Sequence, residues 1–330
     1  MDVTGQELFS PNPRIGSSTP VYFIQQLLDF TQAYVMIVVL LLGIFGNTLS
    51  FVIFLRVRKR ADACVQYLSC LAVSDTGVIL IIGVTDWFAF GLKHITNGEY
   101  GFNLISYSDA SCKSVSGVWH FFEVISAWII VAFSAERAYV VWFPLKRANI
   151  TPKLRKIVLF TIVLGAVLLC IQRFWLMENT QGTPSLCFYK TDPVLSAVLW
   201  QVDISAYAYV PFFLIVQANV FILVAVNFSK NNKLGSNKGK TIQEGKLLVS
   251  LMSVSTLYIA LVLPAAAIFT YLSQAAGTLG EDRALFLWFM VKFLTLISVN
   301  NYCFNFIIYG CTLPFYREEV KRMFSRNRQS

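Results

Sequence analysis

The chain has 330 residues, of which 56% are hydrophobic and only 14% are charged, and its formal net charge is +9. Soluble globular proteins have about 25% charged residues, so this composition excludes a pair of ordinary soluble domains. It also excludes a disordered chain, and seven cysteines are too few at this length for a disulfide scaffold. The composition therefore predicts a protein that crosses a membrane several times.

Seven stretches are long and apolar enough to cross a membrane as helices, which takes about 20 residues each. In chain order they are Thr31–Val57, Cys64–Leu92, Cys112–Phe143, Lys156–Met177, Val194–Phe228, Lys246–Leu272 and Leu285–Cys311. From Leu313 to Phe324, apolar and basic residues can occupy opposite faces, which predicts an amphipathic helix at the membrane surface. The expected fold class is an all-α membrane protein, a seven-transmembrane helix bundle with a short amphipathic helix after the last span.

The basic residues predict the orientation. Most of the 27 lysines and arginines lie in one alternating set of loops and in the C-terminal tail. Because basic residues near span ends stay in the cytoplasm, the N-terminus is expected outside and the C-terminus inside. Residues 1–30 lack a basic segment followed by an apolar one, so the first span is expected to act as the targeting signal. The predicted domains are an extracellular segment at 1–30, the bundle at 31–311, and the amphipathic helix with a short cytoplasmic tail at 312–330.

Asp75 is a charged residue inside the second predicted span, where charge is costly enough to indicate function. Its candidate partners are amide and hydroxyl side chains of three other spans: Asn47, Ser126, Asn301 and Asn305. A carboxylate with such oxygens suits a small hard cation such as sodium, or a water cluster. The alternative is a polar network that only fixes helix packing. No other cofactor is expected.

The outer half of the predicted bundle is acidic and aromatic. The candidate ligand-binding residues there are Asp86, Trp119, His120, Glu123, Asp203 and Lys292. One interpretation is a subsite for a basic ligand group with aromatic walls, which would suit an amidated peptide ending in Arg-Phe. The alternative is that Arg173 and Lys292 neutralise the acids and that the aromatic rings only pack.

Glu136 and Arg137 are adjacent at the inner end of the third predicted span. A carboxylate beside a guanidinium can hold it in one state and release it in another. Without further context, such a pair is an interfacial ion pair. Enzymatic activity is not expected, because the sequence has no Gly-rich phosphate loop, zinc-ligand spacing or catalytic triad.

Several short motifs follow one another in a fixed order: Gly46-Asn47, Leu71 to Asp75, Cys112, Glu136-Arg137, Pro144-Leu145, Cys187, Pro211, Pro264, and Asn305 with Tyr309. Together they resemble the motifs of the rhodopsin-like G-protein-coupled receptors, and the resemblance extends from about Thr31 to Phe324. The resemblance implies a multi-pass receptor of the plasma membrane. It implies a disulfide between Cys112 and Cys187, a sodium-site role for Asp75, and G-protein coupling through Glu136, Arg137 and Tyr309. The implied partners are an extracellular ligand, a heterotrimeric G protein, arrestin and membrane lipids, and nucleic acid is not among them.

Four positions depart from the usual family pattern: Ala138, Asn219, Val262 and Phe306. The segment from Asn305 to Tyr309, with no Trp in the sixth span, is similar to invertebrate neuropeptide receptors of the FMRFamide, myosuppressin and sex-peptide type. Val299 stands where an opsin needs lysine, and Trp119 stands where amine receptors need aspartate. The similarity to these neuropeptide receptors, with the acidic and aromatic residues of the outer half, makes an amidated neuropeptide the expected ligand. The alternatives are an orphan or lipid-type receptor and, from another class, a seven-span transporter or channel.

Overall fold

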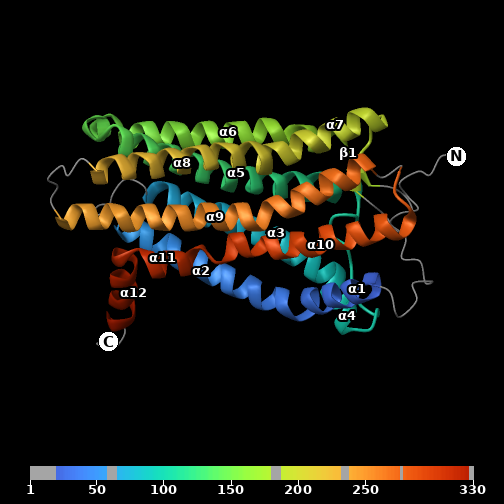
Figure 1. Ribbon diagram of the computed structural model, residues 1–330. Helices are drawn as coiled ribbons and strands as arrows, with labels where there is room; N and C mark the ends of the chain where they lie inside the picture. Colours follow the sequence, from blue (N-terminus) through green and yellow to red (C-terminus); the bar gives the residue numbers. More distant parts are fainter. Residues whose placement is uncertain (1–19, 58–64, 180–186, 232–237, 276–277, 327–330) are drawn as a thin grey trace.

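The computed structural model describes residues 20–57, 65–179, 187–231, 238–275 and 278–326. Seven of its helical segments are long and apolar enough to span a membrane, which confirms the predicted bundle. They are Tyr22–Val57, Val65–Ile95, Asp109–Trp142, Pro152–Leu176, Pro193–Phe228, Gly245–Ala275 and Arg283–Cys303. Figure 1 shows them running side by side, with α1 (Pro20–Phe30) and α12 (Pro314–Arg326) at opposite ends of the bundle.

The first helix begins earlier than predicted. α1 continues without a break through the π-helix η2 (Thr31–Val35) into α2 (Met36–Val57), so the helix starts at Pro20 and not at Thr31. The glutamines and Asp29 interrupt the apolar run in sequence, but Leu28 is buried and α1 packs against α10 (Glu281–Cys303). Residues 1–19 of the predicted N-terminal segment, Cys64 and the tail from 327 onward lie outside the described residues.

The second and third spans are the most deeply buried of the seven. The second consists of α3 (Val65–Asp86), the π-helix η3 (Trp87–Gly91) and α4 (Leu92–Ile95). The third is α5 (Asp109–Trp142), which packs against α3, α6 (Pro152–Leu176) and α8 (Val210–Asn231). The short 3₁₀ helix η4 (Pro144–Asn149) joins α5 to α6. α5 therefore runs through the middle of the bundle, and side chains from several spans can meet on it.

Two short strands lie at the end of the bundle that the basic residues predict to be extracellular, the outer end, where no strand was predicted. β1 (Met177–Asn179) follows α6 directly, and it pairs antiparallel with β2 (Cys187–Tyr189). β2 leads into α7 (Pro193–Ile204), the start of the fifth span, which continues through the π-helix η5 (Ser205–Tyr209) into α8. This hairpin therefore joins the outer ends of the fourth and fifth spans.

The last spans include a break without a proline. The sixth span belongs to α9 (Lys238–Ala275), which contains Pro264. α10 ends at Cys303, Phe304 leaves the helical conformation, and α11 (Asn305–Thr312) then resumes the seventh span. α12 follows and runs in a direction different from that of the spans, outward from the end of the bundle, which confirms the predicted terminal helix (Figure 1).

Candidate functional site

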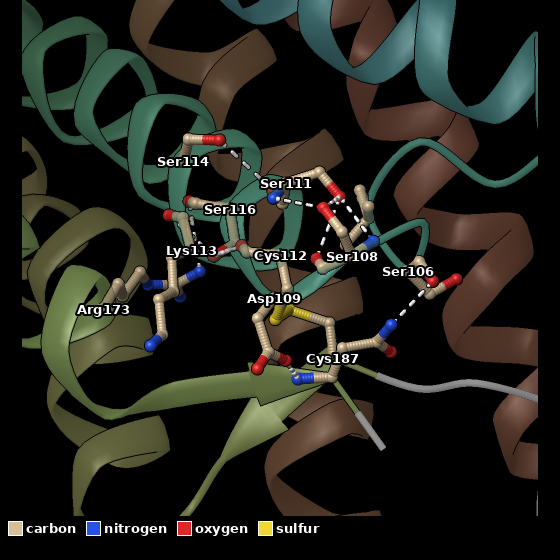
Figure 2. The surroundings of a disulfide bond; sticks show 12 residues. Ser106, Ser108, Asp109, Ser111, Cys112, Lys113, Ser114, Ser116, Arg173 and Cys187 are labelled. Carbon is tan, nitrogen blue, oxygen red and sulfur yellow. Dashed lines mark hydrogen bonds between the residues drawn. A yellow bond between two sulfur atoms is a disulfide. The ribbon is translucent and has the colours of Figure 1, made fainter. Parts of the chain in front are cut away.

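A disulfide fixes the hairpin to the outer end of α5. Cys112 and Cys187 are bonded, with their Cα atoms 5.5 Å apart, as the resemblance implied (Figure 2). Ser108 caps α5 in a capping box with Ser111, and Asp109 Oδ1 accepts a hydrogen bond of 2.8 Å from the backbone N–H of Asn179. The disulfide and this hydrogen bond therefore place β1 and β2 directly over the outer end of the bundle.

Asp203 of α7 is buried, and its carboxylate accepts hydrogen bonds from three side chains of the protein. Arg173 of α6 donates to Oδ2 from Nη2 at 2.7 Å and from Nε at 3.0 Å. Gln172 donates to Oδ1 at 2.8 Å, and the hydroxyl of Tyr189 donates to Oδ2. Burial raises the pKa of Tyr189, so this hydroxyl keeps its proton at neutral pH and remains a donor. For Asp203, the contacts therefore favour internal neutralisation over a ligand contact.

Aromatic rings continue from this ion pair toward α9. The Arg173 guanidinium lies 5.4 Å from the centroid of the Trp200 ring, a cation–π distance. Trp200 packs edge-on against Tyr189 at 5.2 Å and against Phe269 at 5.8 Å between ring centroids. Trp200 therefore packs between the Arg173 guanidinium and the rings of Tyr189 and Phe269.

His120 and Glu123, one turn apart on α5, lie next to the Asp203 carboxylate. His120 Nε2 is 3.3 Å from Asp203 Oδ1, and His120 Nδ1 is 3.9 Å from Glu123 Oε2. His120 is 1% exposed, and neither ring nitrogen makes a hydrogen bond of normal geometry with a described residue. The Glu123 side chain is 13% exposed, and His120 is its only ion-pair partner within 4.0 Å among the described residues. Glu123 is thus an acid without a permanent cation.

Asp86 and Lys292 form a second group, on α3 and α10. The Lys292 ammonium lies 5.0 Å from the Trp288 ring centroid and 5.8 Å from that of Phe90, and it acts electrostatically on Asp86. Within the part of the chain that the structure describes, Asp86 makes no ion pair within 4.0 Å. Trp119 keeps a buried indole N–H without a partner among the described residues. Lys292 is therefore held mainly by aromatic faces.

Asp75 lies at the centre of a polar network between three spans. Its Oδ1 accepts from Ser126 Oγ at 2.6 Å, and its Oδ2 accepts from Asn305 Nδ2 at 2.8 Å. Asn47 instead donates to the backbone oxygen of Tyr302 at 2.9 Å, beside the network. Asn301 keeps both side-chain polar atoms, and Asn305 its Oδ1, buried without partners among the described residues. The free Asn305 oxygen and the Asp75 carboxylate fit a small cation or ordered water.

At the inner end of α5, Glu136 binds two arginines. Arg137 Nη2 is 3.1 Å from Glu136 Oε1. Arg155 of α6 donates to Oε2 from Nε at 2.8 Å and to Oε1 from Nη2 at 3.1 Å. All three side chains are buried, and Arg137 Nε has no partner among the described residues. The sequence had indicated the Glu136–Arg137 pair, but it gave Arg155 only as one of many basic residues near span ends.

Tyr309 lies apart from this arginine group in the contacts that the structure gives. Its ring packs edge-on against Phe54 at 5.3 Å, and its buried hydroxyl has no partner among the described residues. Leu145 of η4, the segment that follows α5, is 97% exposed.

Side chains of neighbouring spans also bind the backbone at the π-helix η5. Trp128 Nε1 donates to the backbone oxygen of Ala206 at 2.9 Å, and the Tyr258 hydroxyl donates to that of Tyr207. A π-helix shifts the backbone register, and such sites are often functional. Val262, at a departure from the family pattern, is buried in the core beside Tyr258, whereas Asn219 keeps a buried unpartnered oxygen. No sequence signal had indicated η5.

In a comparison with protein-family models, residues 46–309 match the family described as 7 transmembrane receptor (rhodopsin family). The matched segment runs from Gly46 of α2 to Tyr309 of α11 and therefore covers most of the bundle. A comparison with curated protein sequences found no significant match.

Proposed function

Because the chain belongs to the rhodopsin family of seven-transmembrane receptors, we propose that it binds an extracellular amidated neuropeptide and activates heterotrimeric G proteins. Members of this family are signalling receptors of the plasma membrane, not enzymes, and they need no cofactor. The family implies an extracellular ligand and a G-protein partner. We propose that the N-terminus is extracellular and the C-terminus cytoplasmic, as the basic loops favour. The family match favours a receptor over a transporter or channel.

The proposed ligand class rests on the surroundings of the Glu123 carboxylate. Asp203 is matched by Arg173, so its charge does not require a ligand. Glu123 has no such partner among the described residues, it is partly exposed, and it lies in the same region as the aromatic rings of Trp200 and Tyr207. A carboxylate in low dielectric attracts a cation, and aromatic faces hold apolar or cationic groups. An amidated Arg-Phe end supplies a guanidinium and a phenyl ring and has no terminal carboxylate to repel Glu123.

Replacing Glu123 with glutamine is expected to raise the half-maximal concentration of an Arg-Phe-amide agonist tenfold or more. Losing one partner of a buried charge pair costs about 2–5 kcal/mol, and about 1.4 kcal/mol corresponds to tenfold. The measurement is guanine-nucleotide exchange in reconstituted membranes after a screen of amidated peptides and their free-acid forms. Glu178→Gln is the matched control, because Glu178 pairs with the exposed Lys190 on the hairpin. Unchanged potency in Glu123→Gln would rule out the cationic subsite.

We propose that the inner end of the bundle, with Arg137 and the exposed Leu145, contacts the G protein. Glu136 holds Arg137 by one hydrogen bond while two bonds from Arg155 occupy the same carboxylate. Arg137 therefore keeps unused donors and is only weakly held. Such a shared carboxylate favours release of Arg137 when the bundle rearranges.

Arg155→Met is expected to reduce agonist-independent nucleotide exchange by about threefold to tenfold. Without Arg155, Glu136 can offer both oxygens to Arg137, and a bidentate pair is stronger and more specific than a single bond. Basal exchange per receptor, measured in membranes with purified G protein, checks this. Lys156→Met removes an exposed charge of the same helix and serves as the control. Higher basal exchange in Arg155→Met would show that Arg155 restrains Arg137 instead.

The Asp75 network is a proposed sodium site for the same receptor. The free Oδ1 of Asn305, whose Nδ2 donates to the carboxylate, is a ligand of the kind that such an ion prefers. Arrestin at the cytoplasmic end and membrane lipids along α12 remain further proposed partners.

A further inference from the structure

The buried cluster on α5, α6 and α7 is not electrically balanced by its permanent charges. Asp203 and Glu123 are two carboxylates, and Arg173 is the only permanent cation that pairs with either of them among the described residues. One negative charge therefore has no fixed counterpart. Within a membrane interior, an uncompensated carboxylate is expensive, so a further positive charge or a proton is required.

His120 occupies the place where that charge is needed. Its two ring nitrogens face the two acids, with Nε2 at 3.3 Å from Asp203 and Nδ1 at 3.9 Å from Glu123. A neutral imidazole has one N–H donor and one acceptor, so it would direct a lone pair at one of the carboxylates. A protonated imidazole donates from both nitrogens and can serve both acids. Each ring nitrogen lies near a carboxylate oxygen, which favours the second form.

Apart from the two carboxylates, the titratable groups around the cluster do not compete for this proton near neutral pH. They come from every element packed here: Cys170 and Arg173 on α6, Tyr189 on β2, Tyr207 on η5, Tyr258 on α9 and Tyr302 on α10. In water, tyrosine and cysteine give up protons only at about pH 10 and about pH 8.5, and arginine stays charged. Histidine is the side chain that ionises in the physiological range.

We infer that His120 is a proton-binding site that completes the charge of the cluster, and that a cationic ligand group beside Glu123 competes with this proton. The second part rests on the proposed function, because it takes the ligand to be cationic. A guanidinium at Glu123 supplies the same charge as the proton, so binding of either weakens binding of the other. The potency of a cationic agonist then rises with pH as His120 loses its proton.

The chain offers a direct test because it has only two histidines. His94 lies at the outer end of the second span, exposed and edge-on to Tyr34. In His94→Gln, carbon-13 labelling of histidine reports on His120 alone, with the rest of the site intact. We expect the signal of the doubly protonated ring at about pH 7. Adding Glu123→Gln should shift the population toward the neutral ring. A neutral ring at about pH 7 in His94→Gln would overturn the inference.

Thermal unfolding of the purified receptor without ligand gives a second readout. Because the proton stabilises the folded cluster, stability is present at low pH and is lost as pH rises and His120 loses its proton. We expect the melting temperature of the wild-type chain and of His94→Gln to fall by about 3 °C or more between about pH 6 and about pH 8. His120→Gln and Glu123→Gln should lack this fall, and a fall of equal size in Glu123→Gln would overturn the inference. Failure of amidated peptides to bind would remove the proposed ligand class and leave these two results unaffected.

Discussion

Arg173→Met is expected to lower the free energy of unfolding by about 3–5 kcal/mol, the usual cost of removing one partner of a buried ion pair. Asp203 would lose two hydrogen bonds and its only permanent counter-charge among the described residues, while its carboxylate stayed buried. Methionine keeps much of the side-chain volume, so the effect comes from charge more than from packing. The checks are the thermal unfolding of the purified receptor and its yield at the cell surface.

Two further variants separate charge loss from general damage. Arg173→Met combined with Asp203→Leu removes both charges, and replacing a buried pair with apolar residues is often neutral, so most of the lost stability should return. Lys190→Met breaks the ion pair with Glu178, in which Lys190 is 73% exposed, and should cost less than about 1 kcal/mol. If the double variant were as unstable as Arg173→Met, the Asp203 carboxylate would not be the source of the loss.

These contacts also show what the sequence could predict and what it could not. Hydropathy gives the number of spans, because a run of about 20 apolar residues is the length that a helix needs to cross the hydrocarbon core. Hydropathy does not reveal which basic side chain pairs with a given acidic side chain. Arg173 and Arg155 lie at opposite ends of α6, and their partners Asp203 and Glu136 lie 30 and 19 residues away in the chain. Only the packing of α6 against α5, with the hairpin that leads to α7, brings these pairs together.

Backbone irregularities were equally hidden. The three π-helices η2, η3 and η5 have no sequence signature, yet η5 sets where Trp128 and Tyr258 find their acceptors. η2 and η3 lie side by side, and the Trp87 indole donates to the backbone oxygen of Ala33 at 3.3 Å. In contrast, the disulfide was available from the resemblance, because its two cysteines stand at recognisable places in the chain. Sequence motifs thus identify individual residues such as the two cysteines. The backbone register shifts at the π-helices depend instead on how the spans pack together.

The seventh span is broken although it lacks a proline at the break, so packing must take the place of that local signal. A proline would interrupt a helix by removing an N–H donor and by clashing with the preceding turn. This chain has Phe306 near the break, and the backbone still leaves the helix at Phe304. The Phe306 ring lies against Gly46 of α2 so closely that a Cβ on Gly46 would be 2.1 Å from its Cδ1 atom. The absence of a side chain at Gly46 therefore leaves the space that the Phe306 ring fills.

Gly46→Ala is accordingly expected to destabilise the receptor by about 1–3 kcal/mol, as overpacking typically does. The added methyl group must displace the Phe306 ring, and with it the start of α11, where Asn305 binds Asp75. The measurement is a double-mutant cycle in thermal unfolding with Phe306→Ala, which removes the ring that the methyl group would meet. The two changes together should cost less than the sum of the single changes, by about 0.5–3 kcal/mol.

Gly165→Ala on α6 is the matched control for this cycle. A Cβ there would meet nothing within 4 Å, so the substitution should be neutral or stabilise the helix by up to about 1 kcal/mol. If Gly46→Ala behaved like Gly165→Ala, position 46 and the Phe306 ring would not be energetically coupled. If the costs of Gly46→Ala and Phe306→Ala simply added, the clash would be relieved elsewhere. A coupling energy confined to the Gly46–Phe306 pair is the expected result. It would show that the contact between this phenylalanine and this glycine helps to hold the seventh span in its broken form.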